Sequence, residues 1–208
     1  GNTQAFRLDA GSGQLAFHAD GLARNDHDYA IRGAMLANSH VQTRTGALGT
    51  SWIDTWGYAG ISVSRYLDNY GNPAEPGDPA NADPAVQLRM QQTRVDARGA
   101  LDAPLPGIDR LEWNLARIDY RHTEFEGTVA GTVFSNRSSE ARLVANTRPW
   151  ADWRGAFGLQ VQHRDFAALG EEAFVSPTVT DASGLFATAR RDIGELTADV
   201  GARIDRVT

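Results

Sequence analysis

The sequence has no cysteine among its 208 residues, which excludes a disulfide framework and a thiolate metal site. It also lacks any run approaching the ~20 consecutive apolar residues that a membrane-spanning helix requires. The first residues, Gly1 to Gln4, have neither the basic start nor the apolar run of a secretory signal peptide. A formal net charge of −6 argues against a nucleic-acid-binding surface, which needs a concentrated basic patch. By composition alone, the chain would suit a water-soluble β protein of one or two domains.

What the sequence does contain is alternation of apolar and polar residues. Successive side chains of a strand point to opposite faces, so an alternating segment predicts a strand with one apolar and one polar face. Residues 14–20, 140–146 and 195–205 follow this pattern. The clearest case is residues 153–164, where Trp153, Phe157, Leu159 and Val161 alternate with Arg154, Gln160, Gln162 and Arg164. About ten strands of roughly 9–15 residues result, a length that crosses a bilayer when the strand is tilted.

The predicted connections alternate between short and long. Short ones lie near residues 11–13, 54–55, 103–107, 148–149 and 192–194, and long ones cover 25–39, 68–83, 123–135 and 166–183. Gly and Pro occur in both kinds, as turns require. Within residues 84–99 and 109–122 the apolar positions shift by one residue, which predicts a β-bulge in each segment.

Aromatic residues separate by end. All five tryptophans, Trp52, Trp56, Trp113, Trp150 and Trp153, lie beside short turns. A second group, Tyr66, Tyr70, Tyr120, Phe125 and Phe166, lies near the opposite ends of the strands. Two such girdles are typical of the membrane–water interfaces of a transmembrane β-barrel. The sequence therefore predicts an all-β fold, an antiparallel up-and-down transmembrane β-barrel wall. A soluble β-sandwich would also alternate, but it gives no reason for tryptophan to gather at one end.

Several segments resemble the barrel of TonB-dependent outer-membrane receptors, most closely the branch associated with zinc uptake. The resemblance covers nearly the whole chain. It is carried by Tyr120-Arg121-His122-Thr123-Glu124-Phe125-Glu126-Gly127, by residues 153–160 and 164–174, and further upstream by residues 59–66, Tyr70-Gly71-Asn72-Pro73 and 104–108. These are wall and loop signatures, so they indicate the family better than the cargo.

The resemblance implies a receptor in the bacterial outer membrane that imports a scarce nutrient and is not an enzyme. Complete members hold an N-terminal plug domain inside a 22-stranded barrel and are driven by the TonB system of the inner membrane. Residues 1–208 contain neither a candidate plug nor a TonB-contacting segment, so we expect an internal fragment of the barrel domain. About ten strands cannot close a wide barrel, which predicts an open, curved sheet. The implied partners are outer-membrane lipid, the TonB system through the plug, and a metal ion or small chelate as cargo, with no resident cofactor.

One outer loop departs from the zinc-uptake branch, whose members often carry a histidine-rich loop after the segment resembling Tyr70-Gly71-Asn72-Pro73. Here residues 74–83 hold acidic residues and prolines without histidine. Carboxylates alone suit harder cations, whereas zinc favours His or Cys supplemented by carboxylate. The loop therefore leaves the identity of a metal cargo open.

Candidate metal ligands lie elsewhere: His18, Asp20, His27 and His40. His18 and Asp20 share the polar face of one predicted strand, His27 lies in the next loop, and His40 begins the following strand. Imidazole with carboxylate is a suitable capture site for a transition metal that must later be released. The alternative is that all four are ordinary polar residues of a wet inner wall.

A second group, His122, Glu124 and Glu126, alternates on one predicted strand face. It suggests a soluble, cupin-like β-barrel enzyme with a metal centre, or otherwise a solvated end of an outer strand. His163 shares a face with Leu159 and Val161 and is expected to point outward. Glu171 and Glu172 lie in a long outer loop, where they would attract cations or keep the loop soluble. No nucleophile motif is present, and a passive porin-like channel remains an alternative to a receptor.

Overall fold

The computed structural model describes residues 1–73, 86–170 and 173–208. Its main element is one antiparallel sheet of ten strands in the order β1-β2-β5-β6-β7-β8-β9-β10-β11-β12. The strands are β1 (Asn2–Ser12), β2 (Leu15–Asp26), β5 (Val41–Asp54), β6 (Gly57–Asn72), β7 (Val86–Leu105), β8 (Ile108–Glu126), β9 (Val129–Thr147), β10 (Arg154–Leu169), β11 (Thr178–Ile193) and β12 (Leu196–Val207). A separate two-stranded hairpin, β3 (Ala30–Ile31) with β4 (Ala34–Met35), lies between β2 and β5. The prediction of an open, curved, up-and-down sheet is confirmed.

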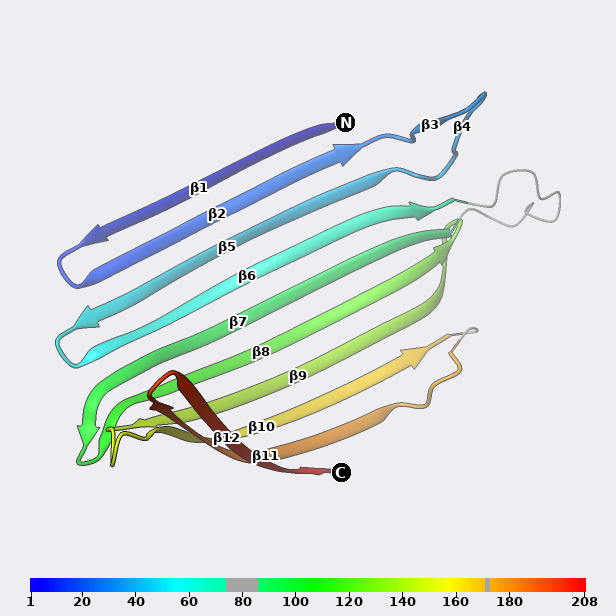
Figure 1. Ribbon diagram of the computed structural model, residues 1–208. Helices are drawn as coiled ribbons and strands as arrows, with labels where there is room; N and C mark the ends of the chain where they lie inside the picture. Colours follow the sequence, from blue (N-terminus) through cyan, green and yellow to red (C-terminus); the bar gives the residue numbers. More distant parts are fainter. Residues whose placement is uncertain (74–85, 171–172) are drawn as a thin grey trace.

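Each strand pairs with the strands that precede and follow it in the sheet, and the sheet curves without closing (Figure 1). The connections that the sequence predicts as short lie at one end, and the β3–β4 hairpin, the tight β8–β9 turn and the remaining connections lie at the other (Figure 1). Gly13 (φ 58°), Gly107 (φ 84°) and Gly194 (φ 63°) occupy the left-handed region in three of the short turns. Glycine adopts this conformation without the steric cost of a Cβ. No helix in the described ranges is long and apolar enough to cross a membrane.

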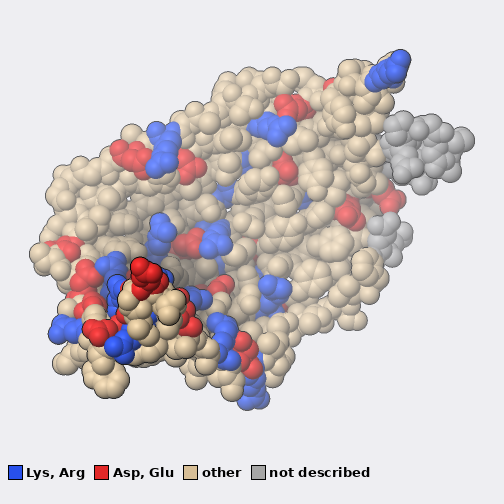
Figure 2. Space-filling view, in the orientation of Figure 1, with Lys and Arg blue, Asp and Glu red and all other residues tan. Residues whose placement is uncertain are grey.

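The two faces of the sheet differ in chemistry. We call the first the apolar face, because the large hydrophobic side chains that are exposed on the central strands lie there, among them Leu48, Ile61, Val63, Val95, Leu159 and Val161. We call the opposite face the polar face. Figure 2 shows charged side chains gathered in the hollow of the curved sheet. The strands form a single layer, so the few buried side chains are mostly small, such as Ala100 and Ala145.

The apolar surface does not run along the rows of paired residues. One such row crosses nine strands, and it begins with apolar residues and ends with polar ones: Leu8, Ala19, Leu48, Val63, Val95, Arg117, Ser139, His163 and Asp181. From β8 onward the apolar residues are therefore nearer the short turns than they are on β5 and β6.

Two sequence predictions about the backbone are wrong. Residues 123–135 are not a long connection, because β8 and β9 continue to a tight turn at Gly127 (φ 60°) and Thr128. The bulges predicted within 84–99 and 109–122 are also absent from the described part of these segments, since β7 pairs with β8 without interruption from Val86 to Asp102. The register shifts lie between Asp102 and Leu105, between Ile108 and Arg110, and between Thr123 and Phe125. The apolar positions of the sequence shift by one residue instead because side chains on the polar face become apolar near the loop end.

The tryptophans lie at the short-turn end as predicted, and Trp150 bridges Trp153 in the connection before β10. The prediction of a second aromatic girdle at the loop end is wrong. Tyr66, Tyr70, Tyr120 and Phe166 alternate with the apolar-face residues and lie half-buried on the polar face, and only Phe125 lies on the apolar face. Tyr66, Tyr70 and Tyr120 lie above the level of the apolar surface, where their neighbours are other tyrosines and polar groups. They therefore do not mark a membrane–water interface.

Candidate functional site

The first predicted ligand pair is assembled on the polar face of β1 and β2. His18 Nε2 lies 2.8 Å from Asp20 Oδ2, and His18 Nδ1 lies 2.6 Å from Asp9 Oδ1. Asp9 is the register partner of His18 and also accepts a hydrogen bond from Arg7 Nε at 2.6 Å. An imidazole donates from both ring nitrogens only when it is protonated, so both carboxylates are satisfied by the cationic form. A metal ion would have to displace a proton and share these carboxylates.

His40 lies at the opposite end, beside the loop that precedes β5. Its Nδ1 lies 3.7 Å from Asp28 Oδ1. The Asp28 carboxylate accepts the backbone N–H of Ser39 at 2.8 Å and of Asn38 at 3.2 Å. These backbone donors, Ser39 foremost, hold the pKa of Asp28 below its ordinary value. Asn38 (φ 59°) in turn donates its side-chain amide to the carbonyls of Asn72 and Val86, which fastens the loop to β6 and β7.

The four predicted ligands do not converge on one point. His18 is opposite Gly49 of β5, whereas His40 directly precedes Val41, so about 27 Å of strand separates their levels. His27 is exposed, between β2 and β3. Within the described residues, no group of three or more His, Asp or Glu side chains is arranged to hold a metal ion. The geometry offers two carboxylate–imidazole pairs at different depths instead of one site.

A cluster that sequence reasoning missed lies on the polar face between the level of His18 and that of His40, near the loop end. It contains Tyr66 and Tyr70 of β6, Tyr120 and His122 of β8, and Phe134 of β9. His122 and Phe134 are register partners, and β7 lies between the residues of β6 and those of β8. The His122 ring lies 5.5 Å from the Phe134 ring, and the Tyr120 hydroxyl lies 3.4 Å from His122 Nδ1.

The sequence analysis gave a solvated end of an outer strand as one interpretation of His122, and this interpretation is wrong. Its side chain is only 17% exposed, and the nearest acidic oxygen, on Glu124, is 4.0 Å from Nε2, which is beyond hydrogen-bonding distance. His122 Nε2 is accordingly buried without a hydrogen-bond partner. An unpaired nitrogen among aromatic rings is a place where a ligand could donate or accept a hydrogen bond. The cupin-like metal centre is not formed by these residues.

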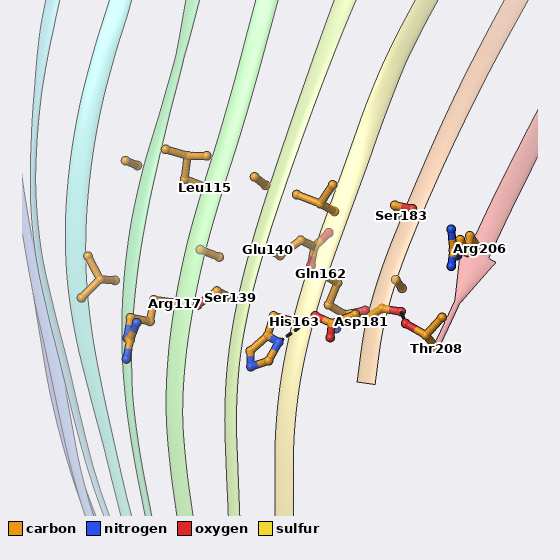
Figure 3. Close-up of a pocket in the computed structure, with 16 residues that line it drawn as sticks. Leu115, Arg117, Ser139, Glu140, Gln162, His163, Asp181, Ser183, Arg206 and Thr208 are labelled. Atoms are coloured by element: carbon orange, nitrogen blue, oxygen red, sulfur yellow. Dashed lines mark hydrogen bonds and ion pairs between the residues drawn. The ribbon is translucent and has the colours of Figure 1, made fainter. Parts of the chain in front are cut away.

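His163 points to the apolar face as predicted. It lines a groove of about 750 Å³ on that face of β7–β12, and its Nδ1 lies 2.7 Å from Asp181 Oδ1 (Figure 3). Both side chains are more than half exposed, so the pair is a surface contact above Val161 and not a metal site. The acidic loop at residues 74–83 and the Glu171-Glu172 pair lie outside the described residues.

No family model matches this sequence. Among solved structures, the chain is similar to the "Copper transporter OprC", with a TM-score of 0.79 and 15% identity over 99% of this chain and 34% of that chain. It is also similar to "The FrpB iron transporter from Neisseria meningitidis (F3-3 variant)", with a TM-score of 0.82 and 13% identity over 99% of this chain and 39% of that chain. The chain thus spans between a third and two fifths of the length of these two transporters. At these identities the likeness shows the fold alone, an antiparallel sheet that matches part of each of these two proteins.

Proposed function

We propose that this chain forms part of the wall of a bacterial outer-membrane transporter that imports a scarce nutrient. The observation that carries the proposal is the opposition of the two faces. An exposed apolar surface of this extent on a single-layer sheet is stable only against lipid, whereas the charged hollow requires water. The fold shared with two transporters supports the same conclusion.

The proposed cargo is a metal ion, zinc included, or a small metal chelate. In this proposal His40 with Asp28, and the exposed His27, meet the cargo at the loop end, and His18 with Asp9 and Asp20 receives it deeper in the hollow. The aromatic cluster around His122 would contact the organic part of a chelate by ring stacking and hydrogen bonding. At His18 the metal competes with the proton that the imidazole holds between the Asp9 and Asp20 carboxylates, which favours release of the cargo.

The proposed energy source is the TonB system, acting through a plug domain in the full-length protein. The test is uptake by cells that express the full-length protein in a strain lacking it. We expect accumulation of radioactive zinc, or of a ferric chelate, against a concentration gradient, and we expect a protonophore to abolish it. Uptake that is insensitive to the protonophore and stops at equal concentrations would identify a passive porin-like channel instead.

A further inference from the structure

Arginines mark the edge of the apolar surface on five neighbouring strands. Moving along the apolar face away from the short turns, the first ionisable residue after the apolar run is an arginine on each of β5 to β9. These are Arg44, Arg65, Arg89, Arg117 and Arg137, and Arg121 follows on β8. All six side chains are exposed. A series of cations at one boundary is not what a general solvated surface requires, since such a surface mixes both signs of charge.

These arginines differ from those of the polar face in their partners. Most arginines of the polar face form ion pairs with nearby carboxylates, as Arg94 does with Asp96 at 2.6 Å and Arg203 with Asp205 at 2.7 Å. Of the six on the apolar face, only Arg137 has a carboxylate partner among the described residues, Asp119 at 3.5 Å.

Arg89 lies over the Phe125 ring, 4.5 Å from its centroid. The described residues give Arg44, Arg65, Arg117 and Arg121 no ion pair, so their charge is available to an external anion.

Three of the arginines line a groove of about 440 Å³. Arg44 and Arg121 lie in the same row of paired residues, three strands apart, at a backbone separation of about 14 Å. Arg89 lies between them on β7. Guanidinium groups bind phosphate oxygens by paired, charge-assisted hydrogen bonds. A span of this width suits an anion with two separated phosphate groups better than a single phosphate ion.

Neutral polar groups complete the groove. Its lining includes Gln42, Asn69, Gln91 and Thr123. Asp68 also lies at the groove, but its carboxylate faces the opposite side of the sheet and accepts a hydrogen bond from the Thr43 hydroxyl at 2.7 Å. Asn69 Oδ1 is buried without a hydrogen-bond partner among the described residues. Because a buried acceptor without a donor is unfavourable, a ligand hydroxyl at this position would satisfy it. Hydroxyls beside phosphates are the chemistry of a phosphorylated sugar.

An apolar groove of about 510 Å³ lies next to it on the same face, toward the short turns. It is lined by Phe17, Leu48, Ile61, Val63 and Val95, on β2 and β5–β7. Leu48 and Arg44 are four residues apart on β5, or about 13 Å. A ligand occupying both grooves would have acyl chains on one side and an anionic, hydroxyl-bearing head on the other.

We propose that the Arg44–Arg89–Arg121 groove binds the phosphate groups of a phosphorylated glycolipid of the outer leaflet, with its acyl chains on the neighbouring apolar groove. This inference rests on the proposed membrane location, because only a lipid layer places such molecules against the apolar face. It assigns to the outer surface of the wall a ligand separate from the cargo in the hollow.

The test uses the full-length protein in detergent micelles and two probes: lipid A with two phosphates, and the same lipid A after phosphatase treatment. The variant is Arg44→Gln with Arg121→Gln. The matched control is Arg98→Gln with Arg164→Gln, two exposed polar-face arginines that have no ion pair within the described residues. We expect the first double variant to weaken binding of the bisphosphorylated lipid by about tenfold or more, and to leave binding of the dephosphorylated lipid unchanged. The control should bind both lipids as the wild type does.

Equal weakening in both double variants, or undiminished binding in Arg44→Gln with Arg121→Gln, would overturn the glycolipid site. Membrane location is measured separately on the same proteins by extraction with alkaline carbonate. A wild-type protein that remains in the membrane but shows no preference for phosphate refutes the inference alone. A wild-type protein released into the soluble fraction refutes the proposed function and the inference with it.

Discussion

Replacement of Leu159 by arginine would place a charge in the middle of the apolar surface. Leu159 is 39% exposed, and its row partners are Leu143 and Leu185. In β10 it lies between Phe157 and Val161, with His163 as the first ionisable residue beyond them. Arginine facing lipid near the bilayer midplane costs about 2–4 kcal/mol of folding free energy. The ratio of folded to unfolded protein should therefore fall by roughly 30- to 900-fold.

The control is the next residue, Gln160→Arg, which faces the hollow. Gln160 donates to Glu140 Oε1 at 2.6 Å and accepts from Arg142 at 3.3 Å. Arginine can still donate to Glu140, while the hydrogen bond from Arg142 is lost, so we expect a cost of about 1 kcal/mol or less.

The assay is a urea titration of the full-length protein in outer-membrane vesicles, in which the folded fraction is read from its heat-modifiable mobility on gels. The midpoint should fall strongly for Leu159→Arg and little for Gln160→Arg. Equal midpoints in the two variants would refute the assignment of lipid-facing and water-facing surfaces.

Three further predictions concern orientation, cargo and the loop beside β5. A cysteine at Ser176 should react with a membrane-impermeant label on intact cells that express the full-length protein, whereas a cysteine at Ser12 should not; equal labelling would contradict the orientation, because these residues lie at opposite ends of the sheet. Replacing His18, His27 and His40 together by Ala should weaken zinc binding in calorimetric titration, an effect that fades below about pH 6, where imidazole becomes protonated; unchanged affinity for zinc and for an organic metal chelate would leave them as ordinary wall residues. The pKa of Asp28 is lowered in the folded protein by its backbone donors, so its contribution to loop stability is present above its unfolded pKa of about 3.9 and is lost as pH falls through the lower folded value. The hydrogen-exchange protection factors of the Ser39 and Asn38 amides should accordingly fall below about pH 4 in the wild type. In Asp28→Asn they should be low and independent of this titration.

Alternation was sufficient to predict the ten strands and their apolar face, because positions on the apolar face recur at every second residue. It failed where the polar face itself becomes apolar. Leu88 and Met90 of β7, and Ile118 and Tyr120 of β8, lie on the polar face, yet their hydrophobicity produced an apparent change of phase. Aromatic residues near the loop end were assigned to a lipid interface for the same reason.

Some contacts of the candidate site could be predicted from the sequence, and others could not. His18 and Asp20 could be paired from their spacing, but Asp9 was overlooked. The signal was present in the Gly13-Gln14 turn: once Ser12 pairs with Leu15, Asp9 must face His18. The contact between Asp28 and His40 depends on a folded loop and has no such periodic signal. Likewise, the aromatic cluster joins three strands, so its formation depends on registers that no single segment reveals.

The slope of the apolar boundary across the paired rows has a geometric consequence. The first ionisable residue beyond the apolar run is Arg44 on β5 but Arg206 on β12. Along the strand direction these two positions differ by six residues, or about 20 Å. Seven inter-strand steps separate the two strands, which amounts to about 34 Å. If that boundary is level with the bilayer surface, the strands are inclined by about 30° to the membrane normal, close to the 35–45° tilt of outer-membrane barrels. Under that condition, the positions of Arg44 and Arg206 along their strands give the tilt of the sheet.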